Sequence, residues 1–545
     1  MGSRLEGFAW ATAGRREAPH EIEKKLHEQR ARVDLLPARP RFLFVIREGA
    51  DTDLTLESLE RQSYPHWKAV VVGAGENPVL ADGCDWIGVL ASGEVLNPAA
   101  LFLFAAEIGI LKPDLIYANE VLCHDGWKRP SFLSKPGPSD LTLWHLDYVG
   151  RPWVISRSSW ISLGGMPAGD HDLLLRAREA GLQWASLPYY LCHRRWRGVL
   201  PAPDPETVRS HLVRRGISAD VRLDGARLRV TPRVEAPLGH RISAIICFRD
   251  RAEWTIRAAT ALSRIAGEIP LEILLVDNDS SAAERKRVER GVEGLAARVI
   301  PFPGGFNFAQ MHNRVVAEHA RGDVLLLLNN DVFLDPQGRL DEWAAWALHA
   351  GVGTVGMLLR YAHGGVQHGG IRARFGGEAR LVRVGHEQGE DALTTASREV
   401  FANTFAAAMV KRSTYEALGG LRAWDVANGF GDVAFNLECV QRGLCNLFLG
   451  GISGIHLESA SRGLGYEYWE ELEIERRFPG LLQRMLRSDL GLDRVPEPDY
   501  SLRDFLGQYT RARLRRSAPW LDPLRTPVKK ILRLAGMVLK GARQT

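Results

Sequence analysis

The 545-residue sequence predicts an α/β fold in which two tandem, Rossmann-like domains each surround a mostly parallel sheet, with helical segments at both termini. Two observations carry this prediction. Short apolar runs alternate with stretches of helical periodicity, as α/β units require. Several elements also recur in the same order in the second half of the chain. The length permits two or more domains, and 45% hydrophobic with 25% charged residues is typical of a soluble protein.

The elements of the first half follow in order. The first 40 residues are rich in Arg, Glu and Lys and predict a charged helical lead-in. The run FLFVI at 42–46 predicts a strand, ESLERQSYP at 57–65 a helix, and KAVVVGAG at 68–75 a second strand. This pattern indicates a first domain over 41–228.

The pattern then restarts after a break. Residues 229–241 contain Pro and Gly without periodicity, which indicates a linker. ISAIICF at 242–248 predicts a strand, WTIRAATALSRI at 254–265 a helix, and LEILLVDNDSS at 271–281 a strand. We therefore expect a second domain over 242–490, followed by a basic amphipathic tail over 491–545.

The recurring elements indicate two copies of one fold. ISRSSWISLGGM at 155–166 matches VKRSTYEALGGL at 410–421, and Asp170 and His193 have counterparts in Asp432 and His456. IGVLASGEVLNP (87–98) matches LLLLNNDVFLDP (325–336). When these two stretches are aligned on their prolines, Asn329, Asn330 and Asp331 fall opposite Ala91, Ser92 and Gly93. The first copy then lacks the acid.

In the second copy, chemistry-bearing side chains follow strand ends. Asp277 follows ILLV, Asp331 follows LLLLNN, Asp432 opens a helix and His456 ends a short apolar segment. Ligands of such sheets bind at the carboxyl ends of the strands, so we expect these groups on one rim. They suit a hard divalent cation and a general base. A single Asp after a strand is more often a helix cap or turn residue.

These motifs resemble a known family. The second domain, over roughly 240–480, resembles the inverting GT-A glycosyltransferases of family two, in the branch for bacterial O-antigens and surface polysaccharides (rhamnosyl- and galactosyltransferase-like). The first domain resembles a degenerate GT-A domain. The motifs that carry the resemblance are VDNDS (276–280), FNFAQMHN (306–313), LLNND (327–331), VQHGGI (366–371), LGG (418–420), GFGDV (429–433) and IHLESASRG (455–463).

The resemblance implies a role for each residue. It predicts transfer of a sugar from a UDP- or dTDP-sugar to a glycan or lipid-linked acceptor, with Mg²⁺ or Mn²⁺ bridging the donor diphosphate. The general base that deprotonates the acceptor would act from the opposite face, which inverts the anomeric centre. The implied residues are Asp432 as base, Asp331 and His456 as metal ligands, and Asp277, Asn313, Asn330 and Arg462 around the nucleotide sugar.

The first domain is predicted to be catalytically silent, because it lacks the nucleotide-contacting acid after its second strand and the acid at 91–93. Because Asp170 is retained, the alternative for the first domain is a metal-independent transferase that uses Asp170. For the whole chain, the alternative is a non-catalytic scaffold or glycan-binding protein with two decayed domains. The observation that favours this alternative is Ala434, which stands at a position where the branch usually has a second acid. A nucleotidyltransferase is disfavoured, since 247–254 has no Gly-rich loop.

Cellular location is predicted from what the sequence lacks and from its tail. Met1 to Pro40 has no apolar core typical of a secretory signal, and no apolar run reaches about 18–20 residues. We therefore expect a cytoplasmic protein. From Arg511 to Thr545 the chain has ten Lys and Arg against one acid, so the tail could contact the inner face of the plasma membrane. No nucleic-acid-binding motif is evident.

Overall fold

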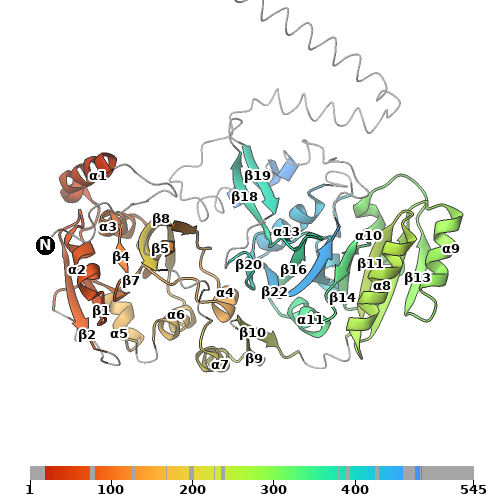
Figure 1. Cartoon of the computed structure of the whole chain (residues 1–545), viewed down its shortest axis with the longest axis horizontal. Helices are drawn as coiled ribbons and strands as arrows, with labels where there is room; N and C mark the ends of the chain where they lie inside the picture. The colour runs from red at the N-terminus through yellow and green to blue at the C-terminus, as the bar shows by residue number, and fades with distance from the viewer. Residues whose placement is uncertain are drawn as a thin grey trace, which may run out of the picture.

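The computed structural model describes residues 19–481, except 74–75, 77–79, 81, 125–128, 167–168, 196–199, 201, 226, 235–239, 377–380, 387–392, 424–428, 458–472, 475 and 479. Two large sheets lie side by side along the long axis (Figure 1). Helices pack on both, and the helix α1 lies at the end of the molecule that carries the first sheet. The predicted basic tail and Arg462 lie outside the described residues.

The first sheet has the strand order β2-β1-β3-β7-β5-β8-β4, with β6 paired to β5. Along this path β7 and β4 run opposite to the other strands. Its strands are β1 (Phe42–Arg47), β2 (Trp67–Val72), β3 (Trp86–Ala91), β4 (Val95–Leu96), β5 (Leu115–His124), β6 (Arg129–Leu133), β7 (Trp153–Ser156) and β8 (Trp184–Arg195). The helices are α1 (Pro19–Arg32), α2 (Thr52–Glu60), α3 (Ala100–Leu111), α4 (Asp140–His145), α5 (Arg157–Ser162), α6 (Asp170–Glu179) and α7 (Pro205–Arg214).

The second sheet has the order β13-β12-β11-β14-β21-β16-β22-β15, with β17 paired to β16 and β20 to β22. Its strands are β11 (Ile242–Phe248), β12 (Leu271–Asp277), β13 (Ala297–Pro301), β14 (Val324–Asn329), β15 (Val332–Leu334), β16 (Val352–Arg360), β17 (Val366–His368), β20 (Arg398–Val400), β21 (Ala407–Lys411) and β22 (Cys445–His456). The helices are α8 (Ala252–Ala266), α9 (Ala282–Gly291), α10 (Phe308–Glu318), α11 (Leu340–Leu348), α12 (Arg412–Ala417) and α13 (Gly431–Gln441). A separate hairpin joins β18 (Ile371–Gly376) to β19 (Leu381–His386).

The two sheets have the same topology. Reading along each order, β2, β1, β3, β7, β5, β8 and β4 correspond to β12, β11, β14, β21, β16, β22 and β15. Each corresponding pair of neighbours also has the same relative direction, from the parallel β1–β2 and β11–β12 to the antiparallel β4–β8 and β15–β22. The recurring sequence elements therefore reflect a repeated fold, in which β13 is an addition at one edge.

Strand registers correct one detail of the sequence alignment. Val95 pairs with His193 in the first sheet, and Val332 pairs with His456 in the second. The residue before each valine is therefore equivalent, so that Glu94, and not Gly93, is the counterpart of Asp331. Alignment on the prolines missed this, because the first copy has three residues between its two strands where the second has two. The first copy has kept a carboxylate at this place.

The predicted elements agree closely with the strands of both sheets, but the predicted linker is wrong in its first part. Residues 229–232 belong to β10 (Arg227–Pro232), which forms a two-stranded hairpin with β9 (Ala219–Asp224). Leu228 and Val230 of this hairpin are buried. A proline at the last position of a short strand is compatible with pairing, so Pro232 did not signal a break.

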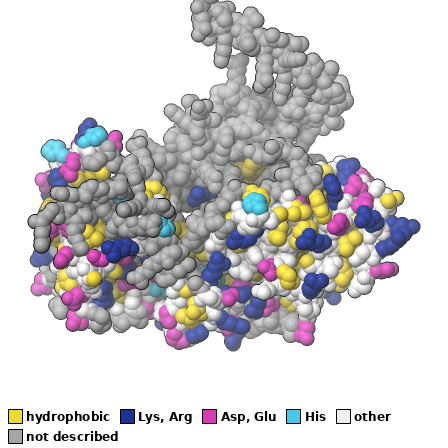
Figure 2. Space-filling view, viewed as in Figure 1, with side chains coloured by type: hydrophobic (Ala, Val, Ile, Leu, Met, Phe, Trp, Pro, Cys, Tyr) yellow, Lys and Arg dark blue, Asp and Glu magenta, His cyan; other side chains and the backbone are white. Residues whose placement is uncertain are grey.

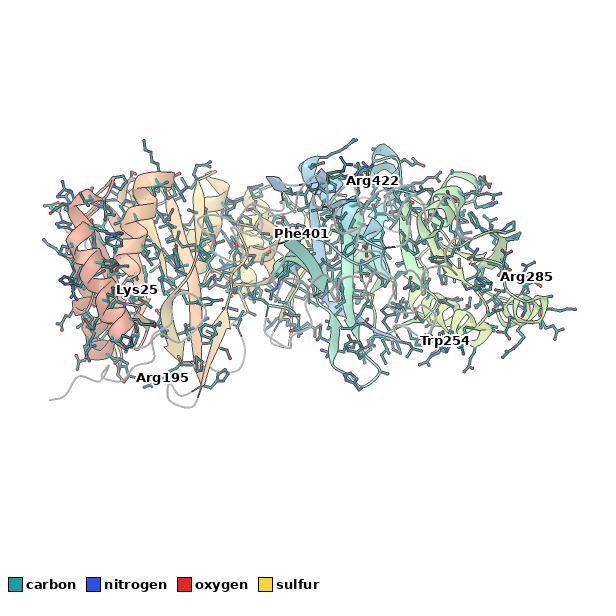
Figure 3. All side chains as sticks on the ribbon, turned by 90° about the horizontal axis from the view of Figure 1, so that it is seen from above. Lys25, Arg195, Trp254, Arg285, Phe401 and Arg422 are labelled. Atoms are coloured by element: carbon teal, nitrogen blue, oxygen red, sulfur yellow. The ribbon has the colours of Figure 1, made fainter. Side chains whose placement is uncertain are left out.

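The β9–β10 hairpin connects the two sheets by packing. The indole Nε1 of Trp346, on α11, donates to the carbonyl oxygen of Val230 at 2.9 Å. Arg229 forms an ion pair with Glu342, also on α11, and Glu342 is only 4% exposed. Trp144 of α4 packs against Trp346 with ring centroids 6.1 Å apart. Viewed from above, the two sheets flank this middle region, with Phe401 near the centre of the molecule (Figure 3).

Candidate active site

The candidate site begins where β14 and β22 end in the second sheet. The strand β14 is an unbroken apolar run buried on both faces, and Asp331 follows it in a tight turn before β15. Pairing of β15 with β22 places Val332 opposite His456, so the carboxylate and the imidazole come together. Asp331 Oδ1 lies 3.3 Å from His456 Nε2, and the carbonyl oxygen of Asp331 accepts from the backbone N–H of Leu457 at 3.1 Å. Both side chains are largely buried.

The partner of His456 fixes which imidazole nitrogen faces the acid. His456 Nδ1 lies 2.7 Å from Gln367 Oε1, while Gln367 Nε2 approaches the carbonyl oxygen of His456 at 3.5 Å. An amide oxygen can only accept, so Nδ1 carries a proton and donates it to Gln367. In neutral His456, Nε2 then turns a lone pair toward the Asp331 carboxylate. Two acceptors at this distance require a positive charge between them, either a proton or a cation.

A divalent cation fits this pair as an incomplete coordination site. Among the described residues, no group of three or more His, Cys, Asp and Glu side chains could hold a metal ion. Mg²⁺ is commonly bound by one or two carboxylates together with substrate phosphates and water. Asp331 and His456 would therefore supply two ligands, and a bound diphosphate would supply others.

Asp432 lies at the start of α13, which begins at Gly431. Its Oδ2 accepts from the backbone N–H of Phe405 at 3.3 Å, and its Oδ1 from that of Val433 at 2.8 Å. The side chain is only partly buried, so a ligand can reach it. Ala434 is fully buried in an apolar cluster with Ile474 and Phe478, so this position contributes to packing.

Asp277 ends β12 and is fully buried. Its Oδ1 accepts from the backbone N–H of Ser280 at 3.0 Å, and its Oδ2 is paired with Arg285 of α9. Arg285 lies at the outer end of the molecule (Figure 3) and is 37% exposed. A nucleotide base would reach Asp277 only by replacing Arg285 at Oδ2.

Asn313 has a structural bonding pattern. Its Nδ2 donates to the carbonyl oxygen of Leu421 at 2.7 Å, and its Oδ1 accepts from the Leu421 N–H at 2.7 Å and from the Tyr415 hydroxyl at 2.6 Å. These bonds hold the glycine turn at 418–420 against α10. Its predicted contribution to a nucleotide pocket would be indirect. Asn330, next to Asp331, donates to Thr255 Oγ1 at 3.3 Å and is half-buried.

The equivalent rim of the first sheet contains a residue that the sequence analysis missed. Arg151 forms ion pairs with Glu94, the counterpart of Asp331, and with Asp170, the counterpart of Asp432. Its side chain is 12% exposed. Burial lowers the pKa of Arg151, but the fields of Asp170 and Glu94 outweigh it and raise that pKa above its ordinary value. Aligning Arg151 with Ala406 would have signalled this difference.

A groove of about 810 Å³ lies on the second sheet, and its lining does not include Asp331 or His456. It runs along α8 and is lined by β15 and β22 residues next to Asp331 and His456, among them Phe333 and Ile455. Four arginines and two acids also line it, and the guanidinium of Arg257 lies 4.0 Å from the ring centre of Phe333. Over the described part of the face in Figure 2, basic and acidic side chains are interspersed.

No helix of the described part is long and apolar enough to cross a bilayer.

Comparison with known proteins finds two relatives, of which one is named for O-antigen biosynthesis. No family model matches the sequence. The chain is 28% identical over 463 residues to the O-antigen biosynthesis protein RfbC of Myxococcus xanthus. The aligned region covers 79% of this chain and 35% of that protein. It is 27% identical over 450 residues to the uncharacterized protein y4gI of Sinorhizobium fredii, with 77% and 48% covered. The chain thus spans between about a third and a half of these relatives.

The solved structures that resemble the chain are distant. GalNAc-T7 with UDP, GalNAc and Mn²⁺ has 15% identity and a TM-score of 0.35, covering 50% of this chain and 55% of that one. The mannosyltransferase PcManGT of Pyrobaculum calidifontis with GDP-Man and Mn²⁺ has 17% identity and a TM-score of 0.30, covering 56% and 79%. S. aureus TarS 1–349 has 12% identity and a TM-score of 0.33, covering 51% and 82%. The similarity of most of the chain to an O-antigen biosynthesis protein agrees with the resemblance that the motifs indicate.

Proposed function

We propose that the chain is an inverting, metal-dependent glycosyltransferase that acts at the second sheet. The observation that carries this proposal is the pair of Asp331 and His456, which lie 3.3 Å apart, so that a cation can bind both in place of a bridging proton. A cation held there would neutralise charge on the departing nucleoside diphosphate. Mg²⁺ and Mn²⁺ both suit a carboxylate and an imidazole with phosphate oxygens.

Asp432 is the proposed general base. It lies at the start of α13 and is accessible, so it can take the proton of an acceptor hydroxyl. As that oxygen bonds to the anomeric carbon, the bond from this carbon to the diphosphate oxygen breaks, and the diphosphate leaves with the electron pair. One displacement from the opposite face inverts the configuration, and no covalent sugar–enzyme intermediate is needed.

The donor is proposed to be a UDP- or dTDP-sugar, with Asp277, Asn330 and Arg462 near the nucleotide. The similarity to an O-antigen biosynthesis protein supports a glycan or lipid-linked acceptor in cell-surface polysaccharide synthesis. The basic tail would hold the protein at the inner face of the membrane. The four arginines along the adjoining groove suit an acceptor that carries negative charge.

The test separates binding from chemistry. Calorimetry with UDP and Mn²⁺ and turnover of a panel of UDP-, dTDP- and GDP-sugars are compared among variants. Asp331→Asn is expected to lose the effect of Mn²⁺ on UDP binding. Asp432→Asn is expected to keep it while turnover falls at least about 100-fold. The control Glu318→Gln, an exposed carboxylate at the end of α10, is expected to change neither. Full turnover in Asp432→Asn would reject the base assignment, and metal-independent UDP binding in the wild type would reject the metal site.

A further inference from the structure

The contrast between the two rims rests on one substitution in an otherwise repeated framework. Trp86 pairs with Ser156 in the first sheet, and Val324 pairs with Lys411 in the second. Counting back five residues from each partner makes Arg151 the counterpart of Ala406. In the second sheet the small side chain of Ala406 stands at this place in the topology. In the first sheet a guanidinium stands at the same place in the topology.

The contacts of Arg151 are those of a built ion-pair network. Nε lies 3.2 Å from Glu94 Oε2, and a terminal nitrogen is paired with Asp170. The other terminal nitrogen donates to the carbonyl oxygen of Gly150 at 3.0 Å. The exposed fractions of the Glu94 and Asp170 side chains are 13% and 21%. The guanidinium is planar and always charged, and it can bridge two carboxylates at once.

The surroundings neutralise the remaining acid in the same way. Glu120, fully buried, is paired with Lys135 at 2.8 Å and with Arg194. Its Oε1 also accepts from the backbone N–H of Arg151 at 2.7 Å. Glu94, Asp170 and Glu120 therefore each have a Lys or Arg partner within the described residues. Asp147, which also interacts with Arg151, lies 3.5 Å from His171 Nδ1.

We infer that Arg151 lies, in the first sheet, between the counterparts of Asp331 and Asp432, where the donor diphosphate with its cation would lie in the second, so that Glu94 and Asp170 form a latent cation site that the protein's own side chain closes. A metal bound by both acids would have to lie between their carboxylates, and the Arg151 guanidinium occupies this space. The first sheet therefore cannot hold a metal–diphosphate complex, although it has kept both acids. This inference rests on the proposed metal site of the second sheet for its comparison, but its test does not.

The experiment counts Mn²⁺ sites on the full chain by electron paramagnetic resonance and calorimetry. Asp331→Asn removes the second-sheet ligand, and this variant is expected to bind no Mn²⁺ at low-micromolar concentration. Adding Arg151→Met is expected to create one site, and adding Asp170→Asn to that double variant is expected to abolish it. Circular dichroism checks folding, and Arg151→Gln replaces Arg151→Met if the latter fails to fold.

Two results would overturn the inference. One is Mn²⁺ binding by Asp331→Asn alone that disappears with Glu94→Gln, since Arg151 would then not close the site. The other is a folded Asp331→Asn/Arg151→Met protein without a new site. The failure of the proposed function would look different, because wild type would then bind no Mn²⁺ while the Arg151 variants still report on the first sheet.

Discussion

At the scale of single residues, Gln367 determines which nitrogen of the His456 imidazole faces Asp331. It accepts from Nδ1 at 2.7 Å and so leaves Nε2 to face Asp331. Replacing it with Leu removes this orientation while keeping a similar volume. We expect Gln367→Leu to weaken Mn²⁺ binding about 10- to 100-fold, as loss of an outer hydrogen bond to a metal-binding histidine does. A Mn²⁺ titration measures this, with the exposed Gln337→Leu as control. Equal affinities in the two variants would contradict it.

His193, the counterpart of His456, is predicted to make stability depend on pH. It is 1% exposed, and burial lowers its pKa to about 3 from the ordinary 6.5. The unfolded chain therefore binds the proton more readily. The stability that neutral His193 allows is complete above about pH 6.5 and falls as the pH drops toward 3, by about 2 kcal/mol between pH 7 and pH 5. Urea unfolding should show this loss shrinking in His193→Gln and unchanged in the exposed His20→Gln.

The residues that the sequence could identify are those whose role follows from position along a strand. Asp331 and His456 each stand at a strand end, and the strand pairing brings them together as expected. Arg151 has no such signal, because its role depends on Glu94 and Asp170, which come from separate elements. The insertion that shifts Glu94 against Asp331 is visible only in the strand register. The FNFAQMHN motif identified Asn313, but its hydrogen bonds to Leu421 and Tyr415 are visible only in the structure.

At the scale of elements, Asn313 joins α10 to the turn that follows α12. Its three hydrogen bonds satisfy both backbone groups of Leu421 and the hydroxyl of Tyr415, which is 2% exposed. Asn313→Ala leaves these groups without their partner, and we expect a loss of about 2–3 kcal/mol in the free energy of unfolding. Chemical denaturation measures the loss. Asn330→Ala, which removes one 3.3 Å bond, is the control and should cost less. A larger effect at Asn330 would contradict the assignment.

Elements were predictable where their hydrophobic pattern is continuous. The strands β11 and β1 are buried apolar runs, and their predicted positions agree with the structure within a residue. The hairpin β9–β10 was missed although Leu228 and Val230 alternate with polar residues, because the prolines and the glycine at 229–241 indicate a linker. The hydrogen bond from Trp346 of α11 to the Val230 carbonyl oxygen is visible only in the structure.

At the scale of the whole molecule, Arg229 and Glu342 connect the hairpin after the first sheet to a helix of the second. Glu342 is 4% exposed, and burial raises its pKa even though Arg229 opposes this. Arg229→Met leaves a buried carboxylate uncompensated, and we expect a loss of about 3–5 kcal/mol at neutral pH. Calorimetry of thermal unfolding measures it. Adding Glu342→Gln should restore most of the stability, and failure of this rescue would show that the pair is not what connects the halves.

The repeated strand order also has a consequence for the evolution of such a chain. An internal duplication gives two equal copies, and each is then free to acquire substitutions under different selection. In the second copy Asp331 and Asp432 are the acids proposed to act on an external ligand. In the first copy Arg151 forms ion pairs with their counterparts, Glu94 and Asp170. A saturation mutagenesis survey should therefore find opposite sensitivities at equivalent positions. Changes at Asp331 and Asp432 would abolish growth-linked activity in protein that is still abundant, and changes at Glu94 and Asp170 would lower abundance.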